Sequence, residues 1–104
     1  MTDVLNQANF TNNVNTDFRI EADLPKPVEL KLISVTPREN APHEQAGMER
    51  FSAVFSGPLD FYLPQSIYRM VHPGMGEFEV FLVPIAKEAD GFRYEAVYNV
   101  FVAD

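Results

Sequence analysis

Two histidines are the residues of this 104-residue chain whose side chains most readily do chemistry. His72 stands between an apolar segment and Pro73, where an imidazole could act as a general base or as a metal ligand. A histidine beside a turn more often forms a hydrogen bond with a turn carbonyl, and we expect this structural role. His43 lies in a long polar segment and is expected to be solvated.

A metal site would require several His, Asp or Glu side chains to converge. Glu77 and Glu79 alternate with apolar residues and would share one face of a strand, with His72 shortly before them. The same alternation is typical of a strand that exposes one face to solvent, and we favour that interpretation. The chain contains no cysteine, which excludes disulfides and thiolate ligands. We therefore expect no metal and no other cofactor.

Catalysis would require partners that the sequence does not place together. None of the serines Ser52, Ser56 and Ser66 stands in a G-x-S-x-G context. Asp60 or Glu95 could pair with a second carboxylate for glycoside hydrolysis, but fifteen acidic residues in a small domain produce such pairs by chance. We expect no catalytic residues and a protein that is not an enzyme.

The charge and the apolar segments exclude two kinds of partner. Fifteen acidic and eight basic residues give a net charge of −7, and the basic residues stand singly, which argues against nucleic-acid binding. No segment reaches the roughly twenty apolar residues of a membrane-spanning helix, so we expect no membrane insertion. The first residues lack the basic and apolar regions of a signal peptide. Location in the cytoplasm, or delivery to an extracellular or virion-like assembly by an unconventional route, both stay open.

The elements that must position these side chains are short apolar stretches separated by Gly and Pro, which predict strands joined by tight turns. A helix is expected over 3–9 with Thr2 as its cap, followed by a connector to residue 16 in which Phe10 and Val14 are anchors. Strands are expected over 17–21, 28–35, 49–56, 65–72, 77–83 and 92–102.

Three local features shape this arrangement. The apolar phase changes near Leu32–Ile33, which indicates a bulge or burial of both faces there. Residues 36–49 show no periodicity and are expected to form a long exposed loop. Asp90-Gly91 is a strong hairpin signal before the last strand. We predict one all-β domain over 1–104, a six-stranded antiparallel small barrel or sandwich with one short N-terminal helix and a Phe-rich core.

Three spaced motifs carry a family resemblance. They are F-x3-F-x-G-P from Phe51, L-P-Q-x2-Y-x3-H-P from Leu63 and G-x4-F-L-V-P from Gly76. In these motifs the chain resembles a small bacterial family of unknown function, some of whose members are associated with phage tail-collar-like appendage proteins. The resemblance implies a one-domain β protein and implies no catalytic residue. We expect the shared pattern to stop before Val100–Asp104.

Two functions follow as hypotheses. The first is a non-catalytic structural or protein-interaction domain, an accessory or assembly subunit of a phage-tail-like or surface appendage. Its partner would be a second copy of itself or a larger tail-collar-like protein, met through the residues Phe61, Tyr62, Phe101, Val102, His43 and Glu44. The alternative is a small-ligand or carbohydrate-binding module in which Phe61, Tyr62 and Tyr68 stack on a sugar, although the same aromatics would equally build a β core.

Overall fold

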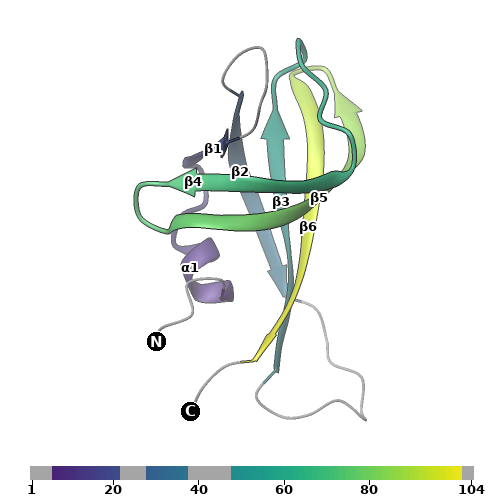
Figure 1. The fold of residues 1–104 in the computed structure, drawn as a ribbon. Coiled ribbons are helices and arrows are strands. Elements are labelled where there is room, and N and C mark those ends of the chain that lie inside the picture. Colours follow the sequence, from purple (N-terminus) through teal and green to yellow (C-terminus); the bar gives the residue numbers. More distant parts are fainter. Residues whose placement is uncertain (1–5, 22–27, 38–47, 102–104) are drawn as a thin grey trace.

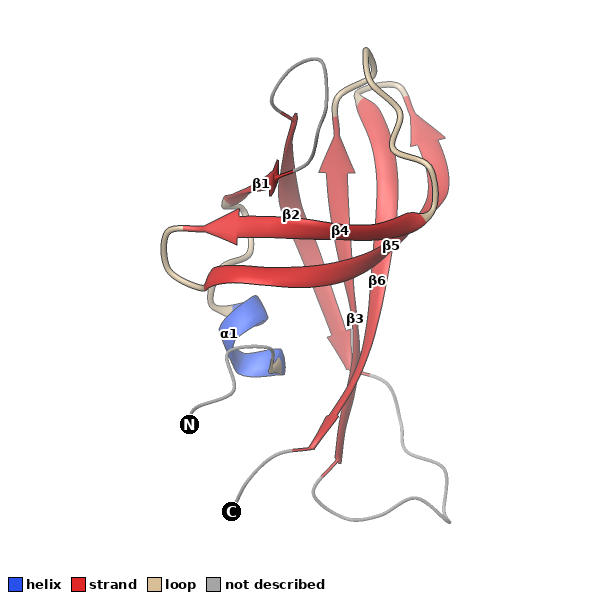
Figure 2. Cartoon of the chain, in the orientation of Figure 1, coloured by secondary structure: helices blue, strands red, loops and turns tan. Residues whose placement is uncertain are grey.

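Six antiparallel strands and one short helix make up the protein in the computed structural model, which describes residues 6–21, 28–37 and 48–101 (Figure 1). In chain order the elements are α1 (Gln7–Thr11), β1 (Asp17–Glu21), β2 (Val28–Pro37), β3 (Met48–Gly57), β4 (Ser66–His72), β5 (Gly76–Glu88) and β6 (Gly91–Phe101). Neighbouring strands pair in the order β1-β2-β3-β6-β5-β4, and β4 pairs with β1 to close a barrel. The predicted all-β fold is confirmed, and the barrel is the architecture that forms (Figure 2).

The strand β5 belongs to both halves of the barrel. Its residues 76–82 pair with β4, and its residues 83–88 pair with β6. The register shifts between Pro84 and Ala86, and such a bulge bends a strand because it adds one unpaired residue to one side of the ladder. The β4–β5 hairpin therefore crosses in front of the upright sheet formed by β2, β3 and β6 (Figure 1).

Alternation in the sequence predicts which residues of a strand face inward. In β1, Phe18 and Ile20 are buried while the residues between and beside them are exposed. In β2 the pairing with β3 shifts between Leu32 and Ser34, which confirms the bulge predicted near Leu32–Ile33. The extra residue changes the phase of the strand, because side chains alternate with a period of two.

The helix lies further along the chain than predicted. The side-chain oxygen of Asn6 caps it by accepting a hydrogen bond from the amide of Asn9 at 2.8 Å. The predicted span 3–9 was wrong because Asn caps a helix as well as Thr does. The predicted cap, Thr2, lies outside the described residues, and α1 carries Phe10. Within the described ranges no helix is long and apolar enough to cross a membrane.

Phe10 lies at the centre of an aromatic cluster and is fully buried. Its ring centroid is 5.2 to 6.3 Å from the rings of Phe18 in β1, Phe51 in β3, Phe78 in β5 and Tyr98 in β6. Each such aromatic pair adds about 0.5–1.5 kcal/mol beyond the burial of its area. Val14, the other predicted anchor, packs against the same core. The predicted Phe-rich core is confirmed.

The ends of the long loop predicted over 36–49 belong to strands. Thr36 and Pro37 continue the ladder between β2 and β3, and β3 begins at Met48. These ends show no alternation of apolar and polar residues, because backbone pairing alone extends the strands there. Pro37 does not prevent this, since proline is tolerated at a strand end. Residues 38–47, the rest of the predicted loop, lie outside the described part of the chain.

Gly91 occupies a position where no side chain fits. A Cβ atom there would lie 2.2 Å from the carbonyl oxygen of Gly57, which is backbone and cannot rotate away. We expect Gly91→Ala to lower the free energy of unfolding by about 3 kcal/mol or more, measured by urea denaturation. Gly76→Ala is the control, because Gly76 has φ +79° but nothing within 4 Å of an added Cβ. Its cost should be limited to the left-handed backbone, about 1–2 kcal/mol, and equal losses in the two variants would contradict the clash.

Candidate functional site

His72 lies buried at the end of β4 and joins the β4–β5 turn to the segment before β1. Its Nδ1 accepts hydrogen bonds from the amides of Gly74 and Met75, at 2.9 and 3.1 Å. These are the first amides available after Pro73, because proline has no N–H. The bond that we expected to a turn carbonyl is thus made to turn amides. The Nε2 atom lies 2.9 Å from the hydroxyl of Thr16.

These contacts assign the neutral form of His72. Nδ1 accepts two hydrogen bonds and carries no proton, so the proton on Nε2 is donated to the Thr16 hydroxyl. That hydroxyl donates in turn to the carbonyl of Asn13 at 2.6 Å. Burial lowers the pKa of His72, and its ring packs on Phe18 with the centroids 4.3 Å apart. Both nitrogens are engaged in structure, which leaves none for a substrate or a metal.

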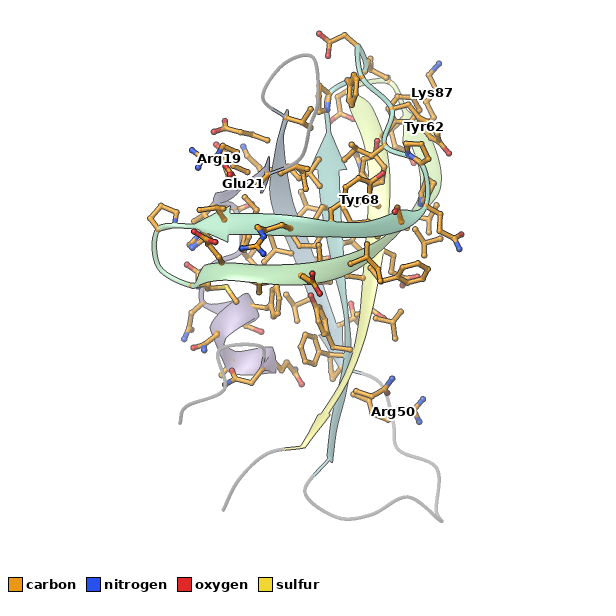
Figure 3. All side chains as sticks on the ribbon, viewed as in Figure 1. Arg19, Glu21, Arg50, Tyr62, Tyr68 and Lys87 are labelled. Atoms are coloured by element: carbon orange, nitrogen blue, oxygen red, sulfur yellow. The ribbon has the colours of Figure 1, made fainter. Side chains whose placement is uncertain are left out.

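A surface hollow of about 530 Å³ opens beside this histidine. Its lining combines charged, polar and apolar side chains, namely Thr16, Asp17, Arg19, Glu29, Val71, His72 and Pro73. The guanidinium of Arg19 is held by the carboxylate of Glu21, with Nη2 and Oε2 2.9 Å apart, and the two side chains lie together at β1 (Figure 3). The hollow therefore offers mixed charge, and its basic group is already paired.

The outer surface of the β4–β5 hairpin carries an apolar pair, Ile67 and Phe81. The two residues are directly opposite each other in the ladder and are 63% and 50% exposed. Neither residue is among the interaction residues predicted from the sequence, although the sequence contains a signal for one of them. Phe81 has the same phase as Glu77 and Glu79, so alternation places all three on the solvent face.

Charged residues surround this Ile67–Phe81 pair. Arg69 follows Ile67 on the same face, lies opposite Glu79, and forms an ion pair with Glu77 at 2.9 Å between Nη1 and Oε1. An exposed apolar centre with a polar rim is the usual anatomy of a protein interface. Because the one base of this hairpin rim is paired, the remaining charge here is acidic.

The aromatic residues near the prolines do not form a common platform. Phe61, which we expected to be exposed, is partly buried against the core. Tyr62 is 49% exposed and meets the ring of Phe92 edge-on, with the centroids 5.2 Å apart. Tyr68 is half-buried, its hydroxyl donates to the carbonyl of Pro64, and burial raises its pKa. Figure 3 shows Tyr62 close to Lys87 at one end of the barrel, where both contact Phe92, and Tyr68 further down, beside β4.

The remaining predicted interaction residues are only partly placed. Phe101 ends β6 and pairs across the sheet with Met48 of β3. Val102, His43 and Glu44 lie outside the described residues. Phe101 lies at the opposite end of β6 from Phe92, whose ring Tyr62 contacts, so Phe101 and Tyr62 do not share a surface.

The groups considered for chemistry are held apart. Glu77 and Glu79 are exposed on the outer face, whereas His72 is buried on the inner face of β4. Within the described ranges no three of His, Asp and Glu gather as metal ligands would. The hydroxyl of Ser56 accepts a hydrogen bond from Arg93 at 3.0 Å. This bond links the side chains of two residues that pair between β3 and β6.

Comparison with known proteins identifies a family. A family model described as a domain of unknown function (DUF6916) matches residues 5–98, which is nearly the whole chain. The match ends before Val100–Asp104, where we expected the shared pattern to stop. No match was found among curated proteins or among solved structures.

The state of His72 predicts a pH dependence of stability. Burial lowers the pKa of His72 in the folded protein. Below about pH 6.5 the unfolded chain therefore binds a proton at His72, while the folded chain keeps this side chain neutral. The free energy of unfolding should therefore decrease as the pH falls from about 7.5 to about 5.5, and this part of the decrease should be absent in His72→Gln. Chemical denaturation at each pH measures both proteins. Both proteins keep His43, the other histidine of the chain, so the difference between the two profiles belongs to His72, and parallel profiles would contradict the assignment.

Proposed function

The chain belongs to the family described as a domain of unknown function (DUF6916), and we propose that it is a non-catalytic protein-interaction domain, an accessory or assembly subunit of a phage-tail-like or surface appendage. The observation that carries the proposal is the exposed Ile67–Phe81 pair on an otherwise acidic domain. Exposure of apolar surface to water costs roughly 25 cal/mol of free energy for each Å². A protein partner that covered Ile67 and Phe81 would remove this cost.

The interior of the barrel supports the same proposal. Its inward residues are large and fully buried, among them Phe10, Phe18, Phe51, Phe55 and Tyr94. Small barrels are commonly filled by their own side chains in this way, and what they bind then contacts the outside. The partner's contact surface would carry an apolar centre and basic residues at its rim, because the rim of the β4–β5 hairpin is acidic.

A pull-down with purified variants tests the proposal. We expect the immobilised wild type to retain a larger structural subunit of an appendage from the source cells, identified by mass spectrometry and then reconstituted from purified components. Ile67→Lys should weaken that complex roughly tenfold or more, because it buries a charge in the apolar centre. Leu59→Lys is the matched control, since Leu59 is similarly exposed, at 45%, and lies outside the strands. Retention of no structural subunit, or equal retention by Ile67→Lys, would refute the proposal.

A second candidate function is binding of a small ligand in the hollow beside His72. Its volume of about 530 Å³ is within the range of ligand pockets. It ranks second because His72 has no free nitrogen and Arg19 is paired with Glu21. Titration with mono- and disaccharides, followed by NMR, should shift the amide signals of Thr16 and Val71 if the hollow binds them. Unchanged signals at millimolar concentration would exclude saccharide binding in this hollow.

A further inference from the structure

The edge of β6 over residues 96–101 is paired on one side only in the described part of the chain. β6 pairs with β3 along its whole length, but its ladder with β5 covers only residues 91–95. Beyond Glu95 the strand β5 turns away to pair with β4, and β6 continues past the crossing hairpin (Figure 1). Alternate residues of this stretch therefore direct their N–H and C=O groups away from β3 without a strand to receive them.

This edge lacks the features that usually protect an open strand. The uncovered part of β2, on the opposite side of the same sheet, has a bulge at residues 32–34 and ends in Pro37. The uncovered part of β5 carries Glu77 and Glu79. The β6 edge belongs to the sequence AVYNVFVA over 96–103, which contains no charge, no Gly and no Pro. Charges, bulges and prolines are the means by which proteins prevent strand addition, so their absence here favours it.

We propose that the edge of β6 pairs with the same edge of a second copy of this chain in an antiparallel, two-fold symmetric dimer. This inference rests on the proposed function and names one of its partners. In such a pair the three-stranded sheets β2-β3-β6 of the two copies merge into one continuous sheet of twice as many strands.

The charge distribution selects a second copy as the occupant. The chain carries a net charge of −7, so most pairs of surfaces on two copies repel each other. A two-fold axis at Tyr98 places Val97 opposite Asn99, and an axis at Asn99 places Val97 opposite Phe101. In either register, residues 96–101 of the two copies meet with no like charges opposite each other. The edge of β6 can therefore pair with the same edge of a second copy without charge repulsion.

Tyr98 belongs to the same stretch of β6, and its side chain packs against the core. Its hydroxyl is buried and has no hydrogen-bond partner among the described residues, although its ring packs on Phe10 and Phe51. Burial raises the pKa of this hydroxyl. An unsatisfied buried hydroxyl costs about 1–3 kcal/mol, and because this ring packs on Phe10 and Phe51, that cost belongs to the interior of the barrel and the dimer does not depend on it.

Light scattering on the full chain tests the dimer. We expect the wild type to have twice the monomer mass of 11.8 kDa at high concentration, and Val97→Lys to raise the dissociation constant roughly tenfold or more. Ile67→Lys, the variant aimed at the β4–β5 hairpin, should leave the dimer unchanged. A wild type that stays at 11.8 kDa up to about 1 mM, or a dimer that Val97→Lys does not weaken, would overturn the proposal.

Cross-linking locates the contact, because the chain has no cysteine of its own. Asn99→Cys should be joined to its counterpart by a short bismaleimide, since both registers bring the two positions within about 8 Å. Lys31→Cys is the control, because Lys31 is exposed in β2 and is paired on both sides, with Asp17 and Ser56. Equal cross-linking of the two variants would contradict a β6 contact.

The two proposals fail separately. Loss of the dimer in Val97→Lys with retention of the appendage subunit supports both, whereas a monomeric wild type that still retains the subunit overturns only the dimer. A dimer with no retained subunit overturns only the assembly role at the Ile67–Phe81 pair. A different strand captured on β6 of a monomeric wild type would also overturn the dimer.

Discussion

The barrel depends on one side chain that is not part of any strand. Phe10 reaches from α1 to rings of β1, β3, β5 and β6. The ladder between β5 and β6 ends at Val83 and Glu95, so beyond that point backbone hydrogen bonds no longer hold these strands together. Packing of Phe78, Phe10 and Tyr98 replaces them, because a buried aromatic side chain gains both burial and ring contacts.

This filling of the interior decides where the protein can act. A six-stranded barrel is narrow, and its inward positions are occupied by aromatic and branched side chains. Chemistry or binding therefore has to use the outside, where the described residues offer a hollow with mixed charge, an apolar pair on the β4–β5 hairpin and an open strand edge. Two of these three are surfaces that suit another protein, and both lie on strands rather than on loops.

Polar contacts complete what the aromatic cluster begins. His72 accepts from two turn amides and donates to Thr16, which joins the β4–β5 turn to the chain before β1 where the barrel closes. β1 is short and pairs with only a few residues on each side, so this closure relies on side chains as well as on its ladders. A buried histidine in this position stabilises the fold only while it is neutral, which makes it a structural residue.

The strands, their inward residues and the bulge in β2 could be predicted from local pattern, because alternation and turn residues act over a few neighbouring positions. The helix start was missed since several Asn and Thr residues can cap a helix, and the partial burial of Phe61 could not be predicted since exposure in a corner depends on what packs over it. Two outcomes required the tertiary structure: the choice of barrel over sandwich and the open edge of β6. Each depends on which distant strands meet and where their ladders stop, which is set by packing of the whole chain and leaves no trace in the spacing of residues within one strand.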